Sequence, residues 1–228
     1  MLLAPLVGMG LGLAGCALLA LADLASAPPL LTAVLTVALL AWLTRGLHWD
    51  GLADLADGLG SGAPRERALE IMKDPSVGAF GVLGLVLVLL TQIAALTALI
   101  AGTDGSTACG ALVTAAVIGR LAVSLACVRG VPSARPAGLG AAVAGSVGRL
   151  AGAVAVLLVS VAIAGYGALT GVGDPWTWLA ILICGLLVGL LTLANGVRRL
   201  GGVTGDVLGA VVELSTTGAL VCAALLLA

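Results

Sequence analysis

Charged residues are scarce in this chain of 228 amino acids. Asp, Glu, Lys and Arg together make up 9% of it, against 61% hydrophobic residues. The ten basic and eleven acidic side chains give a formal net charge of −1, and they are too few to cover the surface of a soluble domain of this size. The mean hydropathy of +1.25 indicates that lipid surrounds most of the folded chain. This composition excludes a soluble globular protein, and we expect no nucleic-acid partner.

Cysteine gives no sign of a covalent or metal-binding framework. The five cysteines are scattered through apolar stretches, without the paired spacing of a disulfide-rich or zinc-binding protein. We expect them to pack as small core side chains. They are Cys16, Cys109, Cys127, Cys184 and Cys222.

Apolar stretches that could cross a bilayer occur seven times. A hydrocarbon core about 30 Å thick needs roughly 20 apolar residues per helix. The second stretch is short unless it continues into the polar residues after it, and the first lacks the basic start and cleavable end of a signal peptide. The sequence thus predicts an all-α polytopic membrane protein with about seven transmembrane helices, forming one integral membrane domain over residues 1–228. The stretches are approximately Leu2–Ala22, Pro29–Leu43, Val77–Ile100, Ala108–Val128, Leu150–Leu169, Trp176–Ala194 and Val207–Leu227.

The basic residues fall in alternate connections between these stretches. Cytoplasmic loops carry the excess of Lys and Arg in membrane proteins. We therefore predict a cytoplasmic amino terminus and cytoplasmic active-site loops at about residues 45–76, 129–149 and 195–206. The protein would be a multi-pass protein of the inner or plasma membrane, with its active site facing the cytoplasm. The opposite connections have only three charged residues, Asp23, Asp104 and Asp174.

Glycine is abundant, with 34 residues, and it concentrates in runs such as "GMGLGLAG" (Gly8–Gly15) and "GAFGVLGL" (Gly78–Leu85). Small residues let membrane helices approach closely, because apolar side chains gain little by leaving lipid for one another. A phosphate-binding glycine loop would need a preceding strand, a lysine and a Ser or Thr, and neither run has this context. The glycines predict tight helix packing.

The acidic residues are concentrated in "HWDGLADLADG" (His48–Gly58), which also holds the only histidine. Asp50, Asp54 and Asp57 are spaced four and then three, which places them on one face of a helix. Like charges on one face need solvent or a cation, and Mg²⁺ prefers carboxylate oxygens. A metal site is one interpretation, and a solvated amphipathic turn is the other. For His48, a helix cap, a supporting hydrogen bond and a catalytic base all stay open.

A second acidic pair lies in "GGVTGDVLGAVVELS" (Gly201–Ser215). Asp206 stands where the last span begins, and Glu213 lies two helical turns deeper on the same face. An ionisable residue within a span needs a partner. Both acids are predicted to meet the three aspartates and complete a carboxylate-lined metal site; the alternative is that Glu213 pairs with an arginine such as Arg120.

The most charged segment is "SGAPRERALEIMKDPSVGAFG" (Ser61–Gly81). It predicts a turn, a helix starting near Pro64 and a stop at Pro75. Such charge runs are usually solvated helix faces, but cations beside an acidic metal site also suit the binding of substrate phosphates. The candidate substrate-binding residues are Arg65, Arg67 and Lys73, together with Arg135 of the next basic connection.

Two long motifs of the chain resemble those of a known family. "GLHWDGLADLADGLGSGAPRERALEIMKDPSVGAFG" and "GGVTGDVLGAVVEL" are similar to the cobalamin synthases, also called adenosylcobinamide-GDP ribazoletransferases. "APLVGMGLGL" (Ala4–Leu13) is similar to the family's first span, and "ARPAGLG" (Ala134–Gly140) to its arginine-and-glycine loop, so the resemblance covers nearly the whole chain. Two features differ: the chain starts almost directly at the first span, without a leading Arg-Leu-Pro-like motif, and Gln92 stands where lysine is common.

The resemblance implies a membrane-bound, Mg²⁺-dependent enzyme of cobalamin (vitamin B12) biosynthesis. It would transfer the adenosylcobinamide phosphate group from adenosylcobinamide-GDP to α-ribazole or its 5′-phosphate, releasing GMP. Its partners would be these two substrates, the lipid bilayer, and either a second copy or other cobalamin-assembly enzymes. The expected metal ligands are Asp50, Asp54, Asp57, Asp206 and Glu213, and the candidates for proton transfer are Asp57, Asp206 and His48.

Two other functions are consistent with intramembrane acids. A cation- or proton-coupled transporter would distribute them through the depth of the membrane, whereas here they cluster beside basic groups. An enzyme that joins a CDP-activated group to a lipid alcohol would use the same metal chemistry. Its usual motif has an arginine where "DGLADLADG" has an aspartate.

Overall fold

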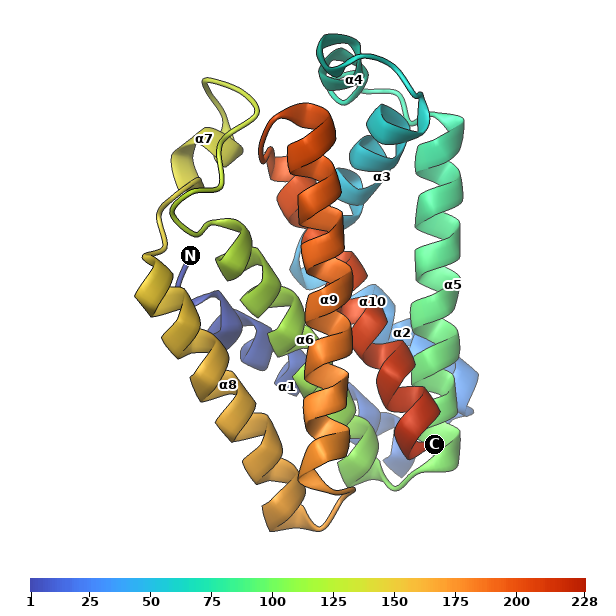
Figure 1. Ribbon diagram of the computed structural model, residues 1–228. Coiled ribbons are helices and arrows are strands. Elements are labelled where there is room, and N and C mark those ends of the chain that lie inside the picture. Colours follow the sequence, from blue (N-terminus) through green and yellow to red (C-terminus); the bar gives the residue numbers. More distant parts are fainter.

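The apolar stretches fold into long helices. The computed structural model describes residues 1–228 and contains ten α-helices and no strand, only isolated bridges between loops (Figure 1). The helices are α1 (Ala4–Leu24), α2 (Pro29–Leu43), α3 (Leu47–Gly60), α4 (Arg65–Ile71), α5 (Ala79–Gly102), α6 (Gly105–Ala126), α7 (Leu139–Val143), α8 (Arg149–Thr170), α9 (Pro175–Leu200) and α10 (Gly205–Leu227).

Six of these helices are long and apolar enough to cross a membrane by themselves: α1, α5, α6, α8, α9 and α10. The pair formed by α2 and α3 is a seventh candidate if it is counted as one bent span. The prediction of an all-α membrane protein with about seven spans is therefore confirmed, and so is the short helix between prolines, which is α4.

The second span is the exception to the predicted pattern. α2 has 15 residues, which is about 22 Å of helix, and α3 meets it at 91° instead of continuing it. The break contains Arg45, whose φ is 54°, and Gly46, whose φ is 68°. The hydroxyl of Thr44 lies 2.9 and 3.1 Å from the carbonyl oxygens of Leu40 and Ala41 and shares its one hydrogen between them. The same two carbonyls accept from the backbone N–H groups of Thr44 and Gly46, so the end of α2 is closed by backbone and side-chain donors together.

Side-chain caps define the start of three spans. Asp104 accepts from the backbone N–H groups of Ser106 and Thr107 at the start of α6, and Asp174 does the same at the start of α9. Hydrogen bonds from the Ser106 hydroxyl and from Thr107 lower the pKa of Asp104 to about 2. Thr204 caps α10. Two of the three acids predicted for the non-cytoplasmic connections, Asp104 and Asp174, thus serve as N-caps, whereas Asp23 lies in the last turn of α1.

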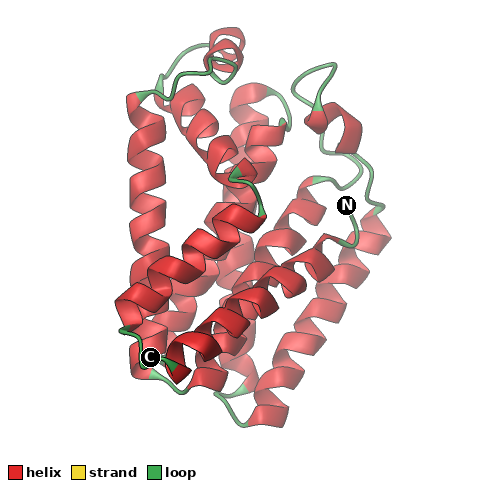
Figure 2. Cartoon of the chain, turned by 180° about the vertical axis from the view of Figure 1, so that it is seen from behind, coloured by secondary structure: helices red, strands yellow, loops and turns green.

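The centre of the bundle consists of α6 and α10, which are the most buried spans. α1 packs against α6 through glycine: a Cβ at Gly12 would lie 2.6 Å from the Cα of Val113, and one at Gly8 would overlap the Ala116 carbonyl. The first glycine run therefore serves tight helix packing, as predicted. Figure 2 shows α1 from behind, running obliquely across the bundle from the amino terminus.

The basic connections gather at one end of the bundle. α4, α7 and the turn between α9 and α10 lie together there (Figure 1), and we call this the α4 end. Its loops are joined through their backbones, because Ala134 N–H donates to the Val203 carbonyl at 3.0 Å and Val203 N–H donates to Pro132 at 2.8 Å. The connections that contain Asp23, Asp104 and Asp174 lie at the opposite end.

Candidate active site

The two predicted acidic segments meet where α3 crosses the start of α10. The helices approach to backbone contact at two glycines. A Cβ at Gly51 would lie 2.9 Å from the Cα and carbonyl oxygen of Asp206, and a Cβ at Gly209 would lie 3.1 Å from the Cα of His48. This close approach brings the aspartates of α3 next to Asp206, as the sequence predicts.

Asp50 and Asp54 are the unpartnered acids of this site. Asp50 is exposed and Asp54 is half-buried, and neither carboxylate takes part in a hydrogen bond or an ion pair within the protein. The like charges of Asp50 and Asp206 both act on Asp54. Asp206 accepts from the Thr204 hydroxyl at 3.1 Å and lies 3.9 Å from a guanidinium nitrogen of Arg135. The charges of these three carboxylates therefore act on one another, with Arg135 as the cation beside Asp206.

Asp57 has a different role from its neighbours. It is buried, and its two carboxylate oxygens accept from the backbone N–H groups of Gly78 at 2.7 Å and Gly81 at 2.8 Å. The glycines admit this contact, since a Cβ at Gly78 would lie 2.5 Å from an Asp57 oxygen. Asp57 thus caps the first turn of α5. The second glycine run lets a carboxylate reach the α5 backbone as well as letting helices pack.

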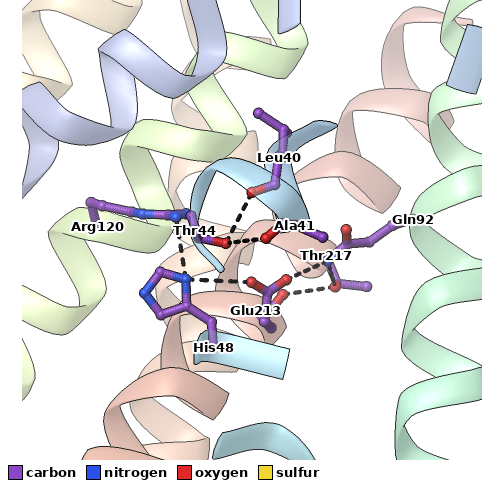
Figure 3. Close-up of polar contacts among 8 residues, drawn as sticks. All are labelled: Leu40, Ala41, Thr44, His48, Gln92, Arg120, Glu213 and Thr217. Atoms are coloured by element: carbon purple, nitrogen blue, oxygen red, sulfur yellow. Dashed lines mark hydrogen bonds and ion pairs between the residues drawn. The ribbon is translucent and has the colours of Figure 1, made fainter. Parts of the chain in front are cut away.

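Glu213 belongs to a buried polar network in the interior of the bundle (Figure 3). Gln92 of α5 donates to one of its carboxylate oxygens at 3.0 Å, and His48 Nδ1 lies 3.7 Å from the other. Gln92 also donates to the Thr217 hydroxyl at 2.9 Å, and Arg120 donates to His48 Nδ1 at 3.4 Å. The side chains come from four helices, α3, α5, α6 and α10.

The network bears on the alternative prediction that Glu213 pairs with an arginine such as Arg120. Glu213 and Arg120 are 6% and 8% exposed, and buried charges need compensation. They are linked through His48 instead of forming a direct ion pair. They also line one enclosed cavity of about 30 Å³, which is large enough for water. Glu213 is thus engaged away from the α3 aspartates.

The five predicted metal ligands do not all have free carboxylate oxygens. No group of three or more His, Cys, Asp and Glu side chains lies together as a metal cluster. Asp57 is engaged by the α5 backbone and Glu213 by the network. Asp50, Asp54 and Asp206 are left with oxygens available to a cation, and this is the donor type that Mg²⁺ prefers.

Two of the four predicted substrate cations hold loops together. Arg65 donates through Nε to the Leu200 carbonyl at 2.7 Å and through Nη2 to the Ala134 carbonyl at 3.1 Å. Arg135 donates through Nη2 to the Leu69 carbonyl at 2.9 Å, and its buried Nε has no partner. The Nη1 of Arg135 makes no hydrogen bond and lies 3.9 Å from Asp206 Oδ2, so Arg135 is the one of these two residues that lies beside an acid of the site.

The other two cations lie on the outer side of α4. Arg67 pairs with Glu70 at 3.0 Å, and the two side chains are 67% and 64% exposed. Lys73 is exposed and has no ion-pair partner. Arg67 and Asp57 both line a surface cavity of about 270 Å³ between α3, α4 and the start of α5. The cations thus divide into two groups and do not form a single cluster around Asp206.

Gln92 and Arg199 make contacts that the sequence did not predict. Gln92 is a polar amide in the middle of α5 and is 5% exposed. Its isolation in an apolar run was the available signal, since such groups need a partner within the membrane. Arg199 lies 3.4 Å from the Ala63 carbonyl, joining α9 to the turn before α4. No local pattern distinguishes this loop contact from a solvated arginine.

Known proteins resemble this chain over nearly its full length. The family described as cobalamin-5-phosphate synthase matches residues 1–224. Three relatives carry the name adenosylcobinamide-GDP ribazoletransferase. One from Frankia casuarinae is 41% identical, covering 99% of this chain and 84% of the relative. One from Nocardioides is 40% identical, covering 96% and 84%, and one from Pseudomonas entomophila is 44% identical, covering 97% and 86%. No solved structure matches the chain.

Proposed function

The chain belongs to the cobalamin-5-phosphate synthase family, and we propose that it transfers the adenosylcobinamide phosphate group from adenosylcobinamide-GDP to α-ribazole or α-ribazole 5′-phosphate. The products are adenosylcobalamin, or its 5′-phosphate, and GMP. The observation that carries the proposal is the full-length similarity to several proteins with this transferase name. That similarity favours the transferase over both a CDP-alcohol phosphotransferase and a transporter.

We propose the junction of α3 and α10 as the catalytic centre, with Mg²⁺ as its cofactor. Asp50, Asp54 and Asp206 are the ligands, because the backbone of Asp206 lies against α3, the three charges act on one another, and the first two have no protein partner. Mg²⁺ commonly keeps several waters and uses only one or two protein carboxylates together with substrate phosphates, so this donor set fits the ion. When bound, the ion offsets the negative charge of the phosphate oxygens during transfer.

The protein groups have separate tasks in this proposal. An α-ribazole hydroxyl attacks the phosphorus attached to the cobinamide arm, and the bond from this phosphorus to the GMP oxygen breaks. A carboxylate of the Asp50, Asp54 and Asp206 group takes the hydroxyl proton. Arg135, whose Nη1 lies 3.9 Å from Asp206 and makes no hydrogen bond within the protein, binds a substrate phosphate oxygen. Arg67 and Lys73 are available for the more distant phosphate, and Arg65 supports the loops that hold Arg135.

We also propose that the α4 end faces the cytoplasm. The loops at this end contain Arg65, Arg67, Lys73, Arg135 and Arg199, whereas the connections at the other end contain only acids. Positive charge is retained on the cytoplasmic side, and nucleotide-activated substrates are made there. The protein is then a multi-pass protein of the inner or plasma membrane. Assembly with a second copy or with other cobalamin enzymes stays a prediction.

The decisive experiment measures GMP release by the purified protein in detergent. It uses adenosylcobinamide-GDP and α-ribazole 5′-phosphate, with Mg²⁺ and then with a chelator. We expect release that requires both substrates and the metal. A folded protein that leaves both substrates intact would overturn the proposal, and CMP release from a CDP-alcohol donor would identify the lipid enzyme instead.

A further inference from the structure

The four polar residues of the α3 motif differ in what they contact. Asp50 and Asp54 make no contact with a protein donor. His48 and Asp57, which lie on either side of them in the sequence, are both tied to membrane-spanning helices. The two free carboxylates therefore lie between two fixed residues.

The start of α3 is fixed by His48. Its Nδ1 lies 3.7 Å from Glu213 of α10 and accepts from Arg120 of α6 at 3.4 Å. Glu213 is in turn held by Gln92 of α5 at 3.0 Å (Figure 3). The imidazole thus connects α3 with α6 through a hydrogen bond and lies close to the Glu213 carboxylate of α10. A neutral imidazole that has its proton on Nε2 accepts the Arg120 hydrogen bond at Nδ1. The 3.7 Å distance from Nδ1 to Glu213 is then a close approach and not a second hydrogen bond.

The end of α3 is fixed by Asp57. Its two oxygens hold the N–H groups of Gly78 and Gly81 at 2.7 and 2.8 Å. A carboxylate at the start of a helix is favoured by the free N–H groups and by the helix dipole. Asp57 thereby joins the last turns of α3 to the first turn of α5.

Between these fixed points, α3 rests on α10 through glycine. At Gly51 and Gly209 the contact is between backbones, so no side chain at the crossing itself sets the position of α3 along α10. The apolar side of α3, with Leu52 and Leu55, packs into the core, but apolar packing is less directional than hydrogen bonding. The chain on the amino side of α3 is broken at 91°, so α2 does not hold α3 in line.

We infer that His48 and Asp57 are positioning residues that clamp α3 at its two ends and so hold Asp50 and Asp54 against Asp206. This inference rests on the proposed transferase site. It separates the motif "HWDGLADLADG" into two residues that position the helix and two that bind the metal. Neither residue touches substrate or metal in this arrangement. Only the two aspartates between them, with Asp206, do so.

The first test is hydrogen–deuterium exchange of the unliganded protein in lipid nanodiscs. We compare Asp57→Ala and His48→Ala with Asp54→Asn as the matched control. Asp57→Ala is expected to increase exchange at residues 78–81 and in α3, and His48→Ala to increase exchange at the start of α3, because each loses one clamp. Asp54→Asn should exchange like the natural protein. Unchanged exchange in both alanine variants would refute the clamps, whether or not the protein makes cobalamin.

The second test separates a clamp from a metal ligand. His48→Asn keeps a hydrogen-bonding side chain without the ring, and Asp57→Asn keeps one of the two oxygens that accept from Gly78 and Gly81. We expect each to recover part of the turnover that its alanine variant loses, because part of the hydrogen bonding that holds α3 is restored. An Asp57→Asn variant that is as inactive as Asp57→Ala and needs at least about tenfold more Mg²⁺, but exchanges like the natural protein at residues 78–81, would make Asp57 a ligand.

Discussion

Gly51 of α3 faces the backbone of Asp206 on α10 so closely that a Cβ at residue 51 would lie 2.9 Å from both the Asp206 Cα and its carbonyl oxygen. Neither atom belongs to a flexible side chain that can move aside. The separation of the two acidic helices is therefore set by the absence of a side chain at position 51, and the catalytic proposal can be tested without changing any carboxylate.

Gly51→Ala should push α3 away from α10. A displacement of about 1 Å at a catalytic site can reduce turnover by about 100-fold, so we expect a loss of between about 10- and 100-fold in GMP release. Gly10→Ala is the control, because a Cβ at Gly10 meets nothing within 4 Å. Equal activity in both variants would contradict the close packing of the site.

Asp54→Asn should remove a metal ligand without unfolding the protein, because this carboxylate supports no protein contact. Loss of several kcal/mol of charge stabilisation corresponds to a decrease of at least about 100-fold in turnover. Steady-state GMP release and size-exclusion chromatography measure the two effects. Near-normal turnover that still responds to a chelator would move the metal away from Asp54.

Gln92→Leu should destabilise the protein, because it removes the donor to a carboxylate that is 6% exposed. An unsatisfied buried group costs about 1–3 kcal/mol, and more if it is charged. We expect a lower Tm in nanodiscs. Thr91→Ala is the neighbouring control, since Thr91 bonds only to the Leu87 carbonyl of its own helix. If both variants melt alike, the network contributes little to stability.

Arg65→Lys should loosen the loops of the α4 end. A lysine cannot reproduce the two donors that Arg65 directs to Leu200 and Ala134. We expect faster hydrogen exchange and proteolysis at residues 132–134 and 200–203. Arg67→Lys is the control, because the Arg67 side chain is 67% exposed and pairs only with Glu70. Identical exchange in the two variants would argue against the loop-fastening role.

The proposed orientation predicts opposite results for reporters at two positions. A reporter fused after Arg67 should report the cytoplasm, and one fused after Asp104 should report the other side, because only the α4 end is rich in basic residues. Alkaline phosphatase and green fluorescent protein fusions provide the measurement. The reverse pattern would place the site outside the cell.

Much of the fold followed from the sequence because hydropathy and charge act locally. The long apolar runs gave the spans, and the prolines around Arg65–Ile71 marked α4. The break after α2 was not predicted. It depends on left-handed residues at positions 45 and 46 and on the packing of α3 across α10, and neither is visible in an average over twenty residues.

The site was predicted in outline and differs in detail for a similar reason. Spacing showed that Asp50, Asp54 and Asp57 share a helix, and they do. Spacing alone could not show that the start of α5 lies against the last of them. Helical spacing placed Glu213 on the same helix face as Asp206. It could not show that Gln92 and His48 lie next to the Glu213 carboxylate in the fold.

The crossing of α3 and α10 also has a consequence for biosynthesis. Six helices separate α3 from α10 along the chain, so Asp50 and Asp54 emerge from the ribosome long before Asp206. α2 is too short to span a bilayer of ordinary thickness when upright, and α3 has no partner until the later spans are inserted. The α2–α3 segment is therefore synthesised before the helix that completes the site. The reaction centre can form only after α10 has entered the lipid.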